Sequence, residues 1–309
     1  MLADATAGDP ISGLKWARKS LRKLAKQLTG QRHAVSHETV RRLLSLLGYS
    51  PRSNRKRLNR KQDPTRDRQM GYLARKRRAY IKAGNPVISV DTKKKELVGN
   101  FKHAGRTWRR TALEVLVTDF ASDASGTAIP YGIYDVARQH GFVVVGTSHE
   151  TAHFAVAAIR RWWLQVGRSA YPDTEQVLIQ ADAGGANSNR SWLWKFALQS
   201  FADEFGLTII VTHYPTSASK WNPIEHRLFN AISLNWAGQP LVSYETVLKF
   251  IRTTQTENGL RCTAYLDTTA YLTQLNVSPA DKASINLVRH RVLPQWNYTI
   301  RPRKAHGSK

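Results

Sequence analysis

The stretch Val-Leu-Ile-Gln-Ala-Asp-Ala-Gly-Gly at residues 177–185 has the pattern of a buried strand that ends in an acid. Its first five residues are mostly apolar and lead into Asp182, and the next three are small. A short apolar run bounded by glycines is typical of a strand inside a sheet. The small residues leave room beside the backbone for a phosphate group. The stretch therefore predicts a core strand that carries a carboxylate to the edge of a sheet.

Two more acids stand in comparable positions. Asp91 follows the apolar run at residues 86–90, and Glu225 opens an amphipathic helix after the loop at residues 217–223. Each acid also has a plainer explanation, because Asp at a strand end often forms a turn and Glu in a first helical turn complements the helix dipole. Three further acids compete for the same assignment, namely Asp119, Asp123 and Asp135.

Beyond residue 85 the chain alternates between apolar runs and helical periodicity. The expected strands cover residues 87–91, 113–118, 128–136 or 142–145, 177–181 and 207–212, and the expected helices cover 150–166 and 191–205 and begin again near 223. The resulting order is three strands followed by helix, strand, helix, strand and helix. This order is that of the RNase H-like fold, and it predicts an α/β domain with a mixed sheet flanked by helices.

Together, Asp91, Asp182 and Glu225 indicate a metal-dependent phosphoryl-transfer site. Two divalent cations about 3.5–4 Å apart can activate the attacking oxygen and stabilise the leaving oxygen of a phosphodiester. Mg²⁺ needs only one or two carboxylates besides water and substrate phosphates, so three acids suffice. We expect two Mg²⁺ ions, for which Mn²⁺ can substitute. Just before Glu225, Lys220 is placed to contact phosphate and Trp221 to stack on an unpaired base.

The charge of the chain favours nucleic acid as its partner. Its 309 residues carry 47 Lys and Arg against 22 Asp and Glu, for a net charge of +25 and a pI near 10.5. Such an excess attracts polyanions. Residues 1–85 hold 22 of these basic residues and only 5 of the acidic ones, so the N-terminal part is expected to bind DNA. The hydrophobic content of 41% is enough for a sizeable core.

The first 49 residues are expected to form a basic helix-turn-helix-like unit. Apolar residues repeat with helical spacing within residues 14–28 and again from Val40 to Leu47, and Ser36 is a good N-cap for the second helix. Second helices of such units enter the major groove with their N-terminal residues toward the bases. The helix would present His37, Glu38, Arg41 and Arg42 to DNA. A small helical hairpin with a solvated basic face is the alternative.

Residues 50–84 are expected to join the two domains as a basic linker and helix. Residues 50–68 lack apolar periodicity and are dense in cations, among them Arg55, Lys56 and Arg57, as expected of a linker that follows phosphates or of a solvated tether. A basic helix should cover residues 69–82. The composition change near Gly84 places the catalytic domain at residues 85–309, with a helical C-terminal extension.

The remaining features concern the cellular compartment and the histidines that could assist proton transfer. A single cysteine, Cys262, fits a reducing compartment, and residues 1–4 lack the charged start of an export signal. We therefore expect a cytoplasmic protein without a membrane segment that associates with the nucleoid when bound to DNA. His213 and His226 could assist proton transfer, although hydrogen-bonded structural roles are favoured. The tryptophans, mostly at helical spacing, are interpreted as core residues.

Four segments carry a family resemblance. They are Val-Asp-Thr-Lys-Lys-Lys-Glu at 90–96, Ile-Pro-Tyr-Gly-Ile-Tyr-Asp at 129–135, Ala-Asp-Ala-Gly-Gly at 181–185 and Ser-Lys-Trp-Asn-Pro-Ile-Glu-His-Arg-Leu-Phe at 219–229. With them the chain resembles the Rhodopirellula-type DDE transposases of bacterial insertion sequences, which are distantly mariner-like. The similarity runs from about residue 13 to 302, and residues 236–241 share it without a chemical role. It implies an RNase H-like core, a divalent metal and a triad at Asp91, Asp182 and Glu225.

The chain departs from that pattern in two places. It starts just before residue 13, where family members generally carry more helical sequence, so recognition of transposon ends is expected to be the function most affected. It also has Ala183 where the family often has Cys, beside the second Asp and outside the expected ligands.

The leading hypothesis is a transposase that cleaves the element's ends and joins them to target DNA. Its expected partners are the terminal repeats, the target DNA and further copies of the chain assembled on them. The first alternative is a catalytically decayed or regulatory DNA-binding protein derived from a transposase. An RNase H-like nuclease that acts on structured DNA or RNA is the second alternative. A nucleotide-driven enzyme is not indicated, since the sequence holds no Gly-rich phosphate loop ending in Gly-Lys-Ser/Thr.

Overall fold

A mixed β-sheet organises the larger part of the chain. The computed structural model describes residues 20–51, 64–216, 218 and 221–303, together with the backbone of two short strands at 6–8 and 15–17. The chain divides into two compact units, Met1–Asn59 and Arg60–Lys309.

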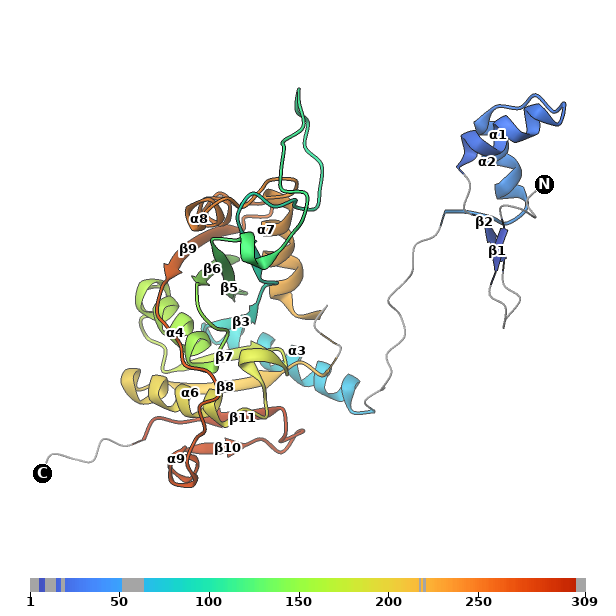
Figure 1. Cartoon of the computed structure of the whole chain (residues 1–309). Helices are drawn as coiled ribbons and strands as arrows, with labels where there is room; N and C mark the ends of the chain where they lie inside the picture. The colour runs from blue at the N-terminus through green and yellow to red at the C-terminus, as the bar shows by residue number, and fades with distance from the viewer. Residues whose placement is uncertain are drawn as a thin grey trace, which may run out of the picture. The chain divides into compact units, whose positions relative to one another are not determined.

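In the large unit, the described residues form a nine-stranded sheet with the order β10-β11-β8-β7-β3-β5-β6-β9, and β4 pairs with β5 beside it (Figure 1). The strands are β3 (Val87–Thr92), β4 (Glu96–Val98), β5 (Gly126–Asp135), β6 (His140–Gly146), β7 (Gln176–Ala181), β8 (Thr208–His213), β9 (Arg261–Asp267), β10 (Leu287–Arg289) and β11 (Asn297–Ile300). Strand β5 runs antiparallel to its two neighbours, β3 and β6, whereas β7 and β8 run parallel to β3. This five-strand core, with its helix after β6 and another after β7, is the RNase H-like arrangement that the element order predicted.

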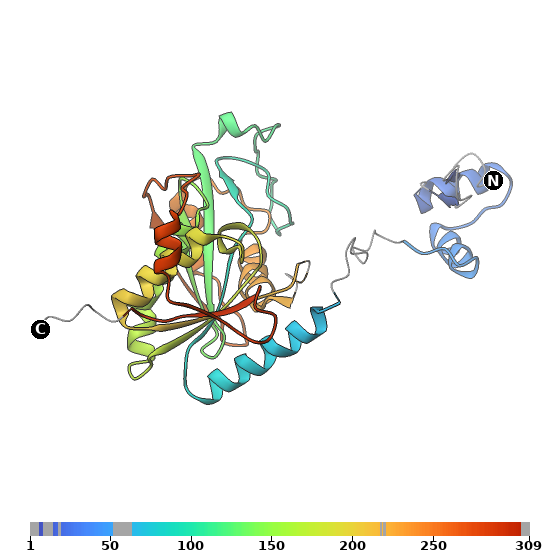
Figure 2. The ribbon, with the colours of Figure 1, turned by 90° about the horizontal axis from the view of Figure 1, so that it is seen from below.

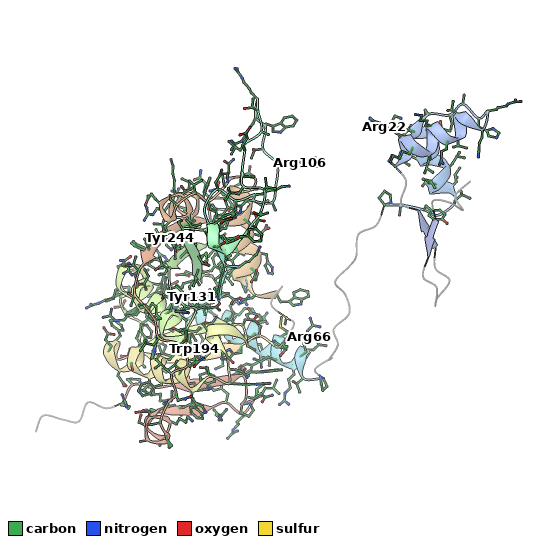
Figure 3. All side chains as sticks on the ribbon, viewed as in Figure 1. Arg22, Arg66, Arg106, Tyr131, Trp194 and Tyr244 are labelled. Atoms are coloured by element: carbon green, nitrogen blue, oxygen red, sulfur yellow. The ribbon has the colours of Figure 1, made fainter. Side chains whose placement is uncertain are left out.

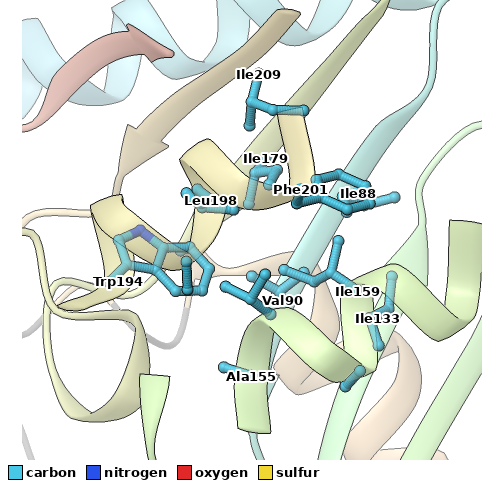
Figure 4. Close-up of a cluster of buried hydrophobic side chains, with 14 of the residues drawn as sticks. Ile88, Val90, Ile133, Ala155, Ile159, Ile179, Trp194, Leu198, Phe201 and Ile209 are labelled. Carbon is cyan, nitrogen blue, oxygen red and sulfur yellow. The ribbon is translucent and has the colours of Figure 1, made fainter. Parts of the chain in front are cut away.

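Helices cover both faces of this sheet because its central strands are apolar on both sides. On one face, α4 (Ala152–Trp162) and α6 (Trp192–Phe205) pack against Ile88, Val90 and Ile179, with Ile159, Trp194 and Phe201 filling the interface (Figure 4). A π-helical turn at Trp163–Gly167 and the short α5 (Arg168–Ala170) continue α4.

The opposite face is covered by elements from two parts of the chain, residues 66–82 and residues 225–252. A π-helical turn (Glu225–Phe229), α7 (Asn230–Asn235) and α8 (Tyr244–Arg252) pack over β5, β6 and β9. The long helix α3 (Arg66–Lys82) runs past the edge of the same face in Figure 2, and its Tyr80 packs on Val87 and Leu178. The short α9 (Pro279–Ser284) lies near the C-terminal strands and contacts α6.

Helix α3 belongs to the large unit rather than to a separate linker. Its Leu73 is buried against Tyr214, and the Gln69 side chain donates to the His213 carbonyl at 2.9 Å and to Asn297 Oδ1 at 2.8 Å. The two compact units therefore divide between Asn59 and Arg60, ahead of the boundary expected near Gly84.

One expected strand is wrong. Residues 113–118 lie in a long excursion between β4 and β5 instead of in the sheet. Leu113, Leu116 and Val117 have the apolar character of a strand, but all three are exposed. The pattern of residues 113–118 shows only a propensity to form a strand. A strand of the sheet also needs a neighbouring strand to pair with, and β5 and β6 already occupy the positions beside β3 and β5. Both alternatives for the third strand, 128–136 and 142–145, are strands of the sheet.

The small unit holds a strand pair, β1 (Thr6–Gly8) with β2 (Lys15–Ala17), and two helices, α1 (Leu21–Gly30) and α2 (His37–Leu46). The first helix starts at Ser20, not near residue 14, because residues 15–17 pair as a strand. Ser36 caps α2 as expected, since its hydroxyl accepts from the Thr39 amide at 3.1 Å. Leu24, Ala25 and Val40 form the buried cluster between the helices.

In the part of the chain that the structure describes, no helix has the length and apolarity needed to cross a bilayer.

Candidate active site

Asp91 and Asp182 lie side by side at one edge of the sheet. Strands β3 and β7 are parallel, and the last residue pair in register is Val90 with Ala181. The two acids follow at the next position of each strand, as the sequence predicted. In both, Oδ1 accepts a hydrogen bond from the following amide, from Thr92 at 2.8 Å and from Ala183 at 3.1 Å. The backbone thus fixes each carboxylate at the same end of its strand.

Glu225 is attached to the strand that carries Asp91. The buried Asn222 accepts a hydrogen bond from the Ser89 hydroxyl, and that hydroxyl accepts from the amide of Ile224 at 3.3 Å. Ser89 stands two residues before Asp91 on β3. The Asn-Pro-Ile-Glu turn at residues 222–225 is therefore hydrogen-bonded to β3, the strand that carries Asp91, and it links Glu225 to that strand. Glu225 begins a π-helical turn, a rare geometry that occurs often at functional sites.

A glycine opposite Asp91 allows the Glu225 helix to come close. Gly132 of β5 is the register partner of Asp91. A Cβ at this position would lie 2.6 Å from Phe229 Cε1 and 2.8 Å from Ile224 Cδ1. These distances are shorter than carbon contacts allow, so only glycine permits this approach. The segment at 129–135, which carried part of the family resemblance, thereby has a physical role.

The three acids share one electrostatic environment. The pKa of Asp91 is raised to about 8, first by burial and then by repulsion from Asp182, Glu225 and Glu150. Burial also raises the pKa of Asp182. The pKa of Glu225 is raised by burial and by Asp182, and Lys93 opposes this shift. Partly buried carboxylates that repel one another favour the proton or a cation.

The donor set fits a hard divalent cation that is completed by substrate. Among the described residues, no three His, Cys, Asp or Glu side chains form a ready-made metal cage. The hollow at the strand ends is nevertheless lined by Asp91, Asp182 and Glu150, together with Thr92, Lys93, Lys94, Lys95, Gly184 and Gly185. Glu225 lines another hollow that shares these three lysines. Carboxylate oxygens are the preferred ligands of Mg²⁺, which usually takes several ligands from water and phosphate.

Two charged residues of this region were not anticipated from the sequence. Glu150 precedes the Thr151 cap of α4, contributes to the raised pKa of Asp91 and pairs with Lys95 at 3.2 Å. Lys93 is nearly buried, pairs with Glu96 at 3.0 Å and lies over the Trp236 ring at 4.4 Å from its centroid. In the sequence Lys93 is the first of three consecutive lysines, and only its packing against Trp236 distinguishes it from the other two.

Two hydrogen-bonded groups hold the loop that follows Asp182. The Tyr131 hydroxyl donates to Asn187 Oδ1 at 2.7 Å, inside the protein (Figure 3). His213 Nδ1 lies 3.0 Å from the Asp182 carbonyl, and its Nε2 lies 3.1 Å from the Tyr298 hydroxyl. A carbonyl only accepts, so Nδ1 carries the proton and Nε2 accepts from Tyr298. The structural role favoured for His213 is confirmed.

His226 and two of the three competing acids, Asp123 and Asp135, lie apart from this cluster. His226 is exposed and lines a separate hollow with Tyr134 and Gln139. Asp135 is buried at the far end of β5, where it accepts from the Tyr171 hydroxyl at 2.9 Å and from two backbone amides. Asp123 is exposed in a short 3₁₀ turn. Asp119 lines a hollow that Glu225 also lines.

The expected DNA-binding residues are only partly described. His37, Arg41 and Arg42 are exposed on α2, where Arg41 pairs with Glu38 at 2.5 Å. Trp221 is about half exposed just before Glu225. Arg55, Lys56, Arg57 and Lys220 lie outside the described residues. Trp162, Trp163, Trp194, Trp236 and Trp296 are buried as interpreted, whereas Trp108, Trp192 and Trp221 are not.

Comparison with known proteins places these residues in a family context. The family model described as the Rhodopirellula transposase DDE domain matches residues 1–302. No curated protein sequence matches the chain. Among solved structures, a Mos1 transposase paired-end complex with the left transposon end gives a TM-score of 0.44 at 14% identity. Mos1 mariner paired-end complexes with Mn and with Mg give 0.43 at 15% and 0.44 at 14%. Each alignment covers 75% of this chain and 65% of the Mos1 chain.

Proposed function

The chain belongs to the Rhodopirellula transposase DDE domain family, and we propose from this premise that it cleaves DNA at the ends of an insertion sequence and joins them to target DNA. One observation carries the assignment of the chemistry. Asp91 and Asp182 follow the paired residues Val90 and Ala181 on neighbouring parallel strands, and the hydrogen bond from Ser89 to Asn222 ties the turn that carries Glu225 to the strand of Asp91.

Asp91, Asp182 and Glu225 would hold two divalent cations, Mg²⁺ or Mn²⁺. When bound, these ions activate the attacking oxygen and stabilise the leaving one. The amides of Thr92 and Ala183 keep the two strand-end carboxylates oriented. The open backbone at Gly184 gives a phosphate room to approach. Water attacks first at the element's end, and the 3′-hydroxyl so produced then attacks the target strand, so positioning and charge stabilisation supply the catalysis.

DNA is the proposed partner of both units. In the small unit, α2 would enter the major groove with His37, Arg41 and Arg42 toward the bases. Arg55, Lys56 and Arg57 would follow phosphates, and Lys220 and Trp221 would hold DNA beside Glu225. Copies of the chain would assemble on the terminal repeats and the target. The protein would act in the cytoplasm and stay on the nucleoid while bound.

Asp182→Asn tests this proposal. The variant should lose Mg²⁺-dependent nicking of DNA that carries the element's end, at least 100-fold, because the ion loses an anionic ligand. Its affinity for the same DNA in a gel-shift titration should change less than twofold. Asp173→Asn, which removes an exposed acid in the turn before β7, is the matched control and should nick normally.

Three outcomes would count against the proposal. Binding by the parent chain without cleavage in Mg²⁺ or Mn²⁺ would leave only a DNA-binding protein. Equal cutting of branched DNA of any sequence would indicate a structure-selective nuclease. Loss of binding together with cleavage in Asp182→Asn would contradict the separation of the two roles.

A further inference from the structure

Residues 99–125 form an arm that leaves the sheet after β4 and returns at β5. In Figure 1 it projects beyond the body of the large unit, and Figure 3 shows Arg106 on it. The segment from 99 to 113 carries four cations and no acid, the cations being Lys102, Arg106, Arg109 and Arg110. The first half of the arm, residues 99–113, is therefore purely basic, whereas the returning half carries Glu114, Asp119 and Asp123, and the proposed chemistry assigns no role to the arm.

The base of the arm is fixed by the turn at residues 236–241. The Gly99 amide donates to the Leu241 carbonyl at 2.8 Å, and the Gly238 amide donates to the Ala104 carbonyl at 2.9 Å. Gly105 adopts a positive φ of 116°, and a Cβ there would lie 2.6 Å from the Cβ of Ala237. These contacts fix the base of the arm against the turn at residues 236–241, so this turn has a structural role.

The same turn connects the arm with the acid cluster. Trp236 begins it, is buried, and has the Lys93 ammonium over its ring. One hollow is lined by the cations Lys94, Lys95 and Lys102, by His103, and also by the acids Glu96, Asp119 and Glu225. Its lysines connect the residues next to Asp91 with the root of the arm. A DNA strand that leaves the acids along this hollow would meet these three phosphate-binding cations.

The outer part of the arm bears a fully exposed indole. Trp108 has no packing contact that covers it, and it stands between Arg106 and Arg109 in the sequence. Indole rings are usually well buried, and an exposed aromatic ring beside cations is what single-stranded nucleic acid binds by stacking. The four cations of residues 99–113 favour DNA as the occupant, because each of them can neutralise a phosphate.

We propose that this arm holds the DNA strand that leaves the active site, with Trp108 stacked on a base unpaired near the cleaved position and Arg106 and Arg110 on flanking phosphates. The inference rests on the proposed function, since it names the form of DNA that the site takes: an end that is locally opened. Arg109, whose guanidinium contacts the Gln239 side chain, helps to fix the arm.

The test uses the full chain with Asp182→Asn, so that DNA stays intact, and DNA ends with 2-aminopurine near the cleaved position. Stacking on Trp108 should quench this probe. Trp108→Ala should abolish the quenching and weaken binding about 5- to 150-fold, the range for one stacked base. Trp108→Phe should restore most of both, whereas Trp108→Leu should not. Arg110→Ala should lower the salt slope of binding by about 0.7–0.9, and Arg168→Ala, on the exposed α5, is the matched cation control.

The result that overturns the inference is unchanged quenching and affinity in Trp108→Ala. A variant that binds DNA normally but sediments as a smaller assembly would also overturn it, and would identify the arm as a contact between copies. The assay does not depend on cleavage. Absence of nicking in the parent chain would therefore refute the proposed function and leave the arm's contact with DNA standing.

Discussion

At the scale of single residues, the acid cluster depends on a neutral imidazole behind it. Trp194 Nε1 donates to the Tyr298 hydroxyl at 2.9 Å, Tyr298 donates to His213, and His213 donates to the carbonyl of Asp182. All three side chains are buried. Each donor in this series has one acceptor, so a second proton on His213 would have to displace Tyr298 from Nε2. The series thereby holds the backbone of Asp182 at one position.

This arrangement predicts a pH dependence of stability. Burial lowers the pKa of His213 from 6.5 to about 4. Between these values the unfolded chain binds a proton that the folded chain rejects, so the free energy of unfolding falls as pH falls from 6.5 toward 4. The full loss from this residue is about 3 kcal/mol. Urea unfolding at several pH values should show that His213→Gln takes up about one proton fewer than the parent on unfolding near pH 5.

Other groups titrate in the same range, among them His290 and the site carboxylates, so the difference between parent and variant is the quantity to compare. Equal pH slopes for the two proteins would show that His213 is protonated in the folded state.

At the scale of elements, the site depends on how closely the Glu225 helix approaches β5. Gly132→Ala should separate them, because its Cβ meets Phe229 and Ile224 at under 3 Å. We expect a loss of about 1–3 kcal/mol in the free energy of unfolding and a larger effect on Mg²⁺-dependent nicking than on DNA affinity. Gly30→Ala, where a Cβ meets nothing within 4 Å, is the control. A stable variant with unchanged nicking would show that the spacing of Glu225 is not critical.

The sequence predicts a helix or strand well where its local pattern agrees with the packing that the folded chain requires. The apolar runs before Asp91 and Asp182 identify β3 and β7 almost to the residue, because a buried strand must be apolar and must end where polar residues begin. Residues 113–118 have the same pattern without a sheet partner, and they lie in the arm. The bond between Ser89 and Asn222 and the position of Glu150 were not predictable, since they join segments far apart in the chain.

At the scale of the whole molecule, the two units have very different means of stabilisation. The large unit is built on a nine-stranded sheet with helices on both faces, in the residues described. The small unit has one buried cluster, Leu24, Ala25 and Val40, with a few partly buried neighbours. A substitution that removes one member of this cluster should therefore unfold the small unit and leave the large one intact.

Leu24→Ala tests the proposal that the small unit recognises the element's ends and that the large unit cleaves DNA. Truncation of a buried leucine lowers the free energy of unfolding by about 2–5 kcal/mol, and a cluster of three buried residues cannot compensate for this loss. We expect the variant to lose its preference for the element's ends over random DNA, while the melting of the large unit and Mg²⁺-dependent nicking at high protein concentration persist. Leu43→Ala, on the exposed side of α2, should change neither property. If Leu24→Ala also abolished nicking of random DNA at saturation, the small unit would have to complete the active site, and cleavage could not be assigned to the large unit alone.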